Sequence, residues 1–200
     1  MSADTVSRDE PPVIQPLSTD AEAWACAELM ASADPWRRLG RTLDQSYRIV
    51  RDPAREVYVA LEPSAAAGPR VAGFIVVIMQ GAFVGYIQSV AVRDDCRGRG
   101  LGTALIALAE RRILRDTPNV FICASSFNPA ARRLYERLGY TVVGELTDYI
   151  VRGHSEILLR KTTGPLAEFG ADETRQVSSP APHTTPVWRQ AFSGKQRFCG

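Results

Sequence analysis

Apolar residues recur along the middle of the chain with two spacings, one typical of strands and one typical of helices. Short apolar runs predict strands at residues 56–62, 71–80, 82–92, 120–124, 141–145 and 154–161. Apolar positions three and four apart predict helices at residues 20–31, 42–51, 101–115 and 129–138. We expect Asp20 to cap the first helix and Gly81 to form a tight hairpin turn. This order of elements predicts an α/β domain.

The two ends of the chain lack this periodicity. Residues 1–16 carry three prolines, and the region after Leu166 mixes Ser, Thr, Pro, Gln and Gly with scattered apolar residues. We therefore expect a mobile extension over residues 1–16, one domain over residues 17–163 and a low-complexity, mobile tail over residues 164–200. Val13 and Ile14 can still supply a first strand, so the boundary near residue 17 stays open.

A glycine-rich turn follows the third predicted strand and opens the third predicted helix. Residues 97–103 read R-G-R-G-L-G-T. Three glycines let backbone N–H groups point inward with no Cβ in the way, and the helix start adds unpaired amides and the positive end of its dipole. Arg97 and Arg99 add fixed positive charge. The turn therefore predicts a binding site for a phosphate or pyrophosphate.

The spacing of this turn separates three phosphate-binding motifs. A nucleotide-triphosphate P-loop needs a lysine after its last glycine, but Lys161 is the first lysine of the chain. A dinucleotide fingerprint fits weakly, because Thr103 stands at its third glycine and the strand at 120–124 ends in two serines. The third pattern, R-x-x-G-x-G, resembles the pyrophosphate-binding turn of the GNAT N-acetyltransferases, which move acetyl from acetyl-CoA to an amine. A plain tight turn between strand and helix is the alternative.

A second motif at residues 128–140 resembles the N-x-x-A-x-x-x-Y-x-x-x-G-F/Y segment of the same family. Read physically, Asn128 caps a helix, Pro129 stands at its first position and Gly139 ends it. With two linked motifs, the chain resembles the GNAT superfamily, in particular bacterial proteins similar to N-terminal and ribosomal-protein acetyltransferases. The resemblance implies a central, mixed, mostly antiparallel sheet that is flanked by helices and whose fourth and fifth strands splay apart.

The resemblance also implies a binding site for acetyl-CoA as co-substrate. Backbone amides of the fourth strand would hold the acetyl carbonyl and the pantetheine arm, the glycine-rich turn the pyrophosphate, and a helix-capping asparagine the pantetheine region. The matching residues are Val90, Ala91, Val92, Arg97, Gly98, Arg99, Gly100, Leu101, Gly102, Thr103 and Asn128. Tyr135 matches the tyrosine that protonates the CoA thiolate; a packed core aromatic is the alternative reading.

The general base is the weakest part of the resemblance. Relatives carry a glutamate or a histidine on the fifth strand, at the position where this chain has Cys123. Tyr86 matches a tyrosine that opens the fourth strand in some N-terminal acetyltransferases and handles a proton through water. Asp148, His154 and Glu156, around the start of the last strand, are further candidates. Among them His154 is favoured, because a neutral imidazole near pH 7 suits proton removal.

The acceptor groove of the family is lined by the connection after the first helix and by the loop before the last strand. Here these segments carry Trp36 and Tyr149, which could clasp an aliphatic or peptide acceptor, and Asp34 and Asp148, which could receive its ammonium. Packing of the first helix against the second is the alternative role of Trp36. A small polyamine would favour a strongly acidic groove, which the sequence does not indicate.

Composition narrows the class of protein further. The net charge is +2, without a basic block, so we expect neither nucleic acid nor a membrane as partner. The four cysteines lie far apart and predict no metal cluster, and no leader or membrane-spanning segment is evident, which predicts a cytoplasmic protein. The predicted function is transfer of acetyl to a primary amine of a small molecule or peptide, with a homodimer suggested by resemblance alone. The alternatives are an acetyl-CoA-binding pseudoenzyme and a regulatory or interaction module.

Overall fold

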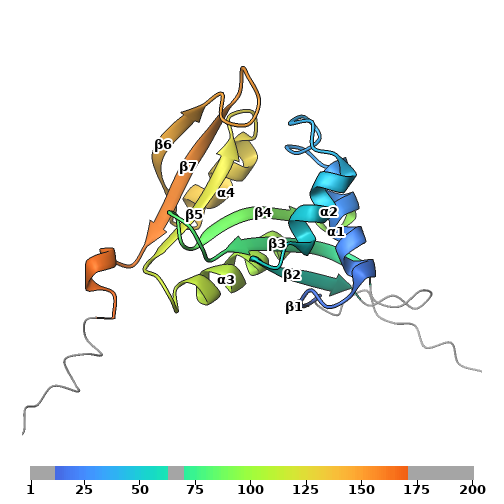
Figure 1. The fold of residues 1–200 in the computed structure, drawn as a ribbon, viewed down its shortest axis with the longest axis horizontal. Coiled ribbons are helices and arrows are strands. Elements are labelled where there is room, and N and C mark those ends of the chain that lie inside the picture. The colour runs from blue at the N-terminus through green and yellow to red at the C-terminus, as the bar shows by residue number, and fades with distance from the viewer. Residues whose placement is uncertain (1–11, 63–69, 171–200) are drawn as a thin grey trace, which may run out of the picture. The chain divides into compact units, whose positions relative to one another are not determined.

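The computed structural model describes residues 12–62 and 70–170 (Figure 1). The described strands are β1 (Val13–Pro16), β2 (Arg55–Glu62), β3 (Arg70–Ile78), β4 (Tyr86–Val92), β5 (Asn119–Ser125), β6 (Thr141–Thr147) and β7 (Ser155–Thr162). The described α-helices are α1 (Asp20–Ser32), α2 (Leu43–Arg51), α3 (Leu101–Ile113) and α4 (Pro129–Arg137). Short 3-10 turns follow β4 at Asp94–Cys96 and β7 at Leu166–Glu168. Most of the tail predicted at residues 164–200 lies outside the described residues.

The strands form one sheet in the order β1-β2-β3-β4-β5-β7-β6. Neighbouring strands run antiparallel throughout, except that β4 and β5 are parallel. The predicted mixed, mostly antiparallel sheet is thus confirmed. β1 forms within the segment predicted as an extension, where Val13 pairs with Leu61.

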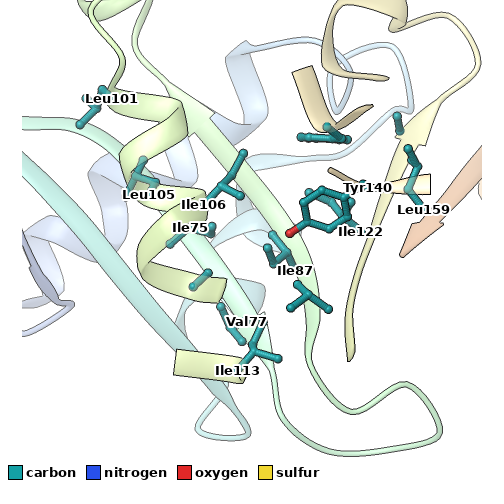
Figure 2. Packing of buried hydrophobic residues seen from close by; sticks show 14 of the residues in the cluster. Ile75, Val77, Ile87, Leu101, Leu105, Ile106, Ile113, Ile122, Tyr140 and Leu159 are labelled. Carbon is teal, nitrogen blue, oxygen red and sulfur yellow. The ribbon is translucent and has the colours of Figure 1, made fainter. Parts of the chain in front are cut away.

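Side-chain alternation along the strands divides the core between the two faces of the sheet. On β3, Phe74 and Val76 pack with α1 and α2, whereas Ile75 and Val77 pack with α3. Leu105, Ile106 and Ile113, spaced as on one face of a helix, cover Ile75 and Val77, and Figure 2 shows these side chains together between α3 and the sheet. The spacing of apolar residues in the sequence therefore accounts for the core on both faces of the sheet.

Three of the four described α-helices begin with a capping side chain. Thr19 and Thr42 form capping boxes with Glu22 and Gln45, and the Asn128 side chain accepts a hydrogen bond from the Ala131 N–H. Thr19, rather than the expected Asp20, caps α1, because Thr19 keeps an extended backbone while Asp20 is already helical. By contrast, α3 begins at Gly100, and no side chain caps it.

The connection between β3 and β4 is longer than expected. Residues 79–85 lie between the strands, so β4 begins at Tyr86 rather than at residue 82. Gly81 and Gly85 both have positive φ, and the Gly85 N–H donates to the Ile78 carbonyl. A Cβ at Gly85 would lie 2.6 Å from the Asn119 carbonyl oxygen, so only glycine fits where this connection meets β5.

β4 and β5 pair over a short stretch and then separate. Tyr86 pairs with Phe121 and Ile87 with Ile122, and the ladder ends there. On the other side of β4, the register with β3 shifts between Ile87 and Ser89, so Gln88 is an extra residue in the strand. The predicted splay of the two central strands is confirmed, and it opens the sheet at its centre.

Candidate active site

A cleft of about 930 Å³ opens where β4 and β5 separate. Its walls come from β4, β5, α4, the α1–α2 connection and the β6–β7 loop. Figure 1 shows the α1–α2 connection and the β6–β7 loop facing each other at the upper end of the molecule. Segments that are far apart in the sequence therefore meet around one cavity.

One end of the cleft lies at the start of α3. Gly98 and Gly100 have φ of 75° and 80°, in the left-handed region that favours glycine. A Cβ at either position would meet no other protein atom within 4 Å, so the space beside the turn is open. Because α3 lacks a side-chain cap, its first amides and the positive end of its dipole remain available to an anion. This end of the cleft fits a phosphate group.

The residues expected to bind cofactor divide into two groups. Six of them line the cleft: Val90, Ala91, Val92, Arg97, Gly102 and Asn128. The other five are Gly98, Arg99, Gly100, Leu101 and Thr103, which are absent from the cleft lining. Arg99 forms an ion pair with Glu62 (3.0 Å), and the Leu101 side chain lies in the core. Only backbone groups of Leu101 can therefore face a ligand.

Tyr135 reaches the cleft from α4, where only 6% of it remains exposed. Burial raises the pKa of its hydroxyl, and the neighbouring Cys123 and Glu156 raise it further. The hydroxyl therefore stays protonated at neutral pH and can donate a proton or a hydrogen bond. The ring also packs against Tyr140, with ring centroids 6.1 Å apart, so the core-aromatic reading of Tyr135 also holds.

Glu156 supplies a buried carboxyl group to the cleft wall. It lies opposite Ser125 in the β5–β7 ladder, and the Ser125 hydroxyl donates to its Oε1 at 2.6 Å. Burial raises the pKa of Glu156, and the serine hydrogen bond partly opposes this shift. The sequence placed Glu156 only among several candidate bases; the available signal was an acidic residue directly before the apolar run of residues 157–159.

Tyr86 and Cys123 meet at the point where the two strands begin to separate. The Tyr86 hydroxyl and the Cys123 thiol lie near enough for each to influence the other's pKa. Burial is the main cause that raises the pKa of Tyr86, and the nearby Cys123, Glu156 and Tyr149 act in the same direction. Burial also raises the pKa of the Cys123 thiol. Both groups are thus neutral at pH 7, and neither can serve as a strong base.

His154 and Asp148 are placed differently. The His154 ring packs edge-on against Phe127, with centroids 4.8 Å apart, and His154 is not part of the cleft lining. Asp148 has a φ of 54°, and its Oδ1 accepts a hydrogen bond from the Gly153 N–H at 2.5 Å. This contact closes the β6–β7 loop on itself. Of the candidate bases around the last strand, the structure brings only Glu156 into the cleft.

The opposite end of the cleft is lined by aromatic and charged side chains. Trp36 is 8% exposed and packs on Phe74, whereas Tyr149 is 65% exposed, and both line the cleft. Asp34 also lines it and pairs with Arg37 at 3.4 Å. The sequence did not single out three further lining residues, Arg38, Arg41 and Phe127. Nothing in their local pattern signals a site.

Two comparisons of sequence place the chain in a family. The acetyltransferase (GNAT) family matches residues 21–140, more than half of the chain. The chain belongs to this family. An uncharacterized N-acetyltransferase of Methanocaldococcus jannaschii is 35% identical over 103 residues, which cover 48% of this chain and 65% of that protein. The L-methionine sulfoximine/L-methionine sulfone acetyltransferase of Pseudomonas aeruginosa is 37% identical over 98 residues, 46% of this chain and 56% of the relative.

These matches span less than two thirds of either relative's length. Among solved structures, NAA60 of Arabidopsis thaliana in complex with acetyl-CoA superposes with a TM-score of 0.63 at 16% identity, covering 76% of this chain and 98% of that one. At this identity the likeness concerns the fold. Within residues 12–62 and 70–170 of this GNAT protein, no helix is long and apolar enough to cross a bilayer.

Proposed function

We propose that this GNAT-family protein transfers acetyl from acetyl-CoA to a primary amine by direct attack, without a covalent enzyme intermediate. The observation that carries the proposal is the position of Glu156 and Tyr135 in one cleft, with the uncapped start of α3 at its end. A buried carboxyl group and a protonated phenol are the two proton-handling groups that amine acetylation needs. The family and the acetyl-CoA complex of NAA60 support the choice of co-substrate.

In this proposal the cofactor is held mainly by backbone groups. Acetyl-CoA supplies an activated thioester. The amides of residues 90–92, freed by the separation of β4 from β5, hold its acetyl and pantetheine portions. The turn at residues 97–103 binds its pyrophosphate with the amides of α3 and with Arg97. Asn128 both caps α4 and contacts the pantetheine arm.

Glu156 and Tyr135 share the proton transfers. The amine nitrogen bonds to the acetyl carbon while the carbon–sulfur bond breaks. An ammonium acceptor loses two protons in becoming an amide: Glu156 passes one to water, and the other ends on the sulfur by way of Tyr135. Tyr86 holds the water through which the acceptor's proton reaches Glu156. Because His154 packs outside the cleft lining, Glu156 takes the role of base in its place.

The acceptor would lie between Trp36 and Tyr149, at the end of the cleft away from α3. The names of relatives point to amino-acid-like acceptors for the Pseudomonas aeruginosa enzyme. The NatC complex bound to a Gag peptide and CoA, which has the same fold, points to peptides. Both classes are primary amines. A cytoplasmic location and a homodimer stay predictions of the sequence.

The test is thiol release from acetyl-CoA with a panel of amines, amino acids and short peptides, using the intact protein and Tyr135→Phe. We expect Tyr135→Phe to lower kcat by about 100-fold while the Kd for acetyl-CoA is unchanged, because only the proton donor is lost. The matched control is Tyr140→Phe, a second buried tyrosine outside the cleft lining. Tight acetyl-CoA binding without release for any amine would favour the pseudoenzyme instead.

A further inference from the structure

Arg41 is an arginine of the cleft wall without a carboxylate partner in the described part of the chain. It lies in the α1–α2 connection, where its N–H donates to the Trp36 carbonyl at 3.0 Å. Its side chain is partly buried, and no described residue forms an ion pair with it. Another cation, Arg55, lies near enough for its charge to act on Arg41, and Arg55 is itself paired with Asp52 at 3.4 Å.

The other two arginines of the cleft have partners. The Arg97 guanidinium lies 2.8 Å from Asp94, and the Arg38 guanidinium lies over the Phe127 ring at 4.7 Å. Burial, and then the neighbouring Arg55, lower the pKa of Arg41. A guanidinium nevertheless remains charged at physiological pH. Arg41 therefore holds a partly desolvated positive charge in the cleft, and an anionic ligand would stabilise it.

Tyr86 lies near enough to Arg41 for the two groups to interact electrostatically, and Glu156 likewise lies near Tyr86. All three residues line the same cleft. The acceptor end thus has a negative group that suits an ammonium and a positive group that suits a carboxylate, both on the wall of one cleft. Such a pair matches a zwitterion.

We propose that the acceptor is a small amine with a free carboxylate close to its amino group, such as an amino acid, and that Arg41 binds this carboxylate. The inference rests on the proposed function. The surrounding Trp36, Leu39 and Ile150 favour an apolar side chain on the acceptor. A peptide N-terminus fits less well, because an amide replaces the carboxylate at this position.

The experiment compares matched acceptors that differ only in the carboxylate. L-leucine, L-methionine and L-phenylalanine are each tested against the corresponding amino-acid amide and the amine that lacks the carboxylate. For at least one series we expect kcat/KM for the acid to exceed that for the amide by about tenfold to a hundredfold, the usual range for a charge-assisted contact. Amine ionisation cannot cause this preference. The amino group of the amide is less basic, so a larger fraction of it is neutral and reactive, which would favour the amide instead.

Arg41→Gln should abolish the preference by lowering kcat/KM for the acid alone, and Arg41→Lys should restore part of it. Arg48→Gln is the matched control, because Arg48 is exposed on α2 and pairs only with Asp44. Equal rates for acid and amide in every series would overturn the inference and leave the acetyltransferase proposal standing. So would an equal loss of both rates in Arg41→Gln.

A binding measurement separates this failure from failure of the proposed function. Calorimetric titration of the same acids and amides into the protein saturated with CoA does not require turnover. If no amine is acetylated, acid binding that is lost in Arg41→Gln still supports the carboxylate site, and absence of acid binding overturns it. The carboxylate bound by Arg41 could instead be the side chain of an aspartate at a peptide N-terminus. Two peptides that differ only in beginning with Asp or with Asn test this possibility. A preference for the Asp peptide over every free amino acid would also overturn the inference.

Discussion

The two ends of the cleft are built from different parts of the polypeptide. At the α3 end, the cleft is lined by Gly102 and Arg97, beside the uncapped backbone amides at the start of α3. At the other end they are side chains from segments far apart in the sequence, Trp36, Arg41, Tyr149 and Glu156. Backbone recognition suits a ligand shared across a family, whereas side chains can change the acceptor without changing the fold.

The start of α3 also differs from the starts of the other three described α-helices in how it is capped. The starts of α1, α2 and α4 are closed by Thr19, Thr42 and Asn128, which satisfy amides that would otherwise lack partners. At α3 the chain has Gly100, whose hydrogen side chain leaves those amides to a ligand. Relative to glycine, a capping side chain would stabilise α3 by only about a few tenths of a kcal/mol. The proposed pyrophosphate site uses these uncapped amides.

The acceptor end should be the more sensitive to loss of a single side chain. We expect Glu156→Gln to lower kcat/KM by about 100-fold to 10 000-fold, because the substitution keeps the shape and an acceptor for the Ser125 hydroxyl but cannot take a proton. The Kd for acetyl-CoA should not change. Steady-state kinetics and equilibrium binding on the same preparation measure the two effects.

The matched control for this prediction is Glu145→Gln on the adjacent strand β6. Glu145 is exposed and pairs in register with Ile157, so its loss should leave both rate and affinity unaltered. A Glu156→Gln enzyme that kept its rate, and also kept the acidic limb of the pH–rate profile, would show that the base lies elsewhere.

The α3 end should respond through affinity for one part of the cofactor. In Gly100→Ala, a Cβ enters the open space beside the turn and the residue must keep a φ of 80°. We expect acetyl-CoA to bind about tenfold more weakly, because the free turn relaxes from this conformation and binding must restore about 1–2 kcal/mol of strain. S-acetyl-pantetheine, which lacks the pyrophosphate, should bind unchanged.

Gly139→Ala provides the control for backbone strain. Gly139 has a φ of 90°, ends α4 and lies outside the cleft lining. Its substitution should lower stability to a similar degree without selective loss of acetyl-CoA. Equal weakening of both thioesters in Gly100→Ala would argue that the turn does not contact the pyrophosphate.

The same contrast explains which parts of the protein could be predicted from the sequence. The order of strands and helices follows from local periodicity. The splay of β4 and β5 and the cleft position of Asn128 and Tyr135 are implied by the resemblance to the GNAT family, which two motifs of fixed spacing carry. Local patterns of this kind can be recognised in the sequence without knowledge of the tertiary arrangement.

The acceptor end could not be predicted in the same way. Arg41 faces the cleft because the chain turns back after Trp36, and no periodicity reports that turn. His154 precedes the first paired residue of β7, so strand alternation does not fix its direction, and it packs on Phe127. Glu156 is held beside Ser125 by a register between strands distant in the sequence.

The smallest expected effect concerns stability rather than rate, and it also distinguishes the two ends. Burial raises the pKa of Glu156 in the folded state above its unfolded value of about 4.3. The folded protein therefore binds this proton more tightly than the unfolded chain. As the pH rises from the unfolded pKa through the folded pKa, this group lowers the free energy of unfolding, and above the folded pKa its cost is constant.

Because glutamine cannot ionise, we expect Glu156→Gln to be more stable than the parent protein at neutral pH. The difference in stability should fade when the pH falls below about 4, where Glu156 is protonated in both the folded and the unfolded protein. Urea unfolding of both proteins at several pH values measures it. A variant that is less stable by the same amount at every pH would mean that packing dominates. A variant that gains stability while losing rate would mean that the acceptor end keeps a buried charge for its chemistry, a cost that the backbone-built α3 end does not carry.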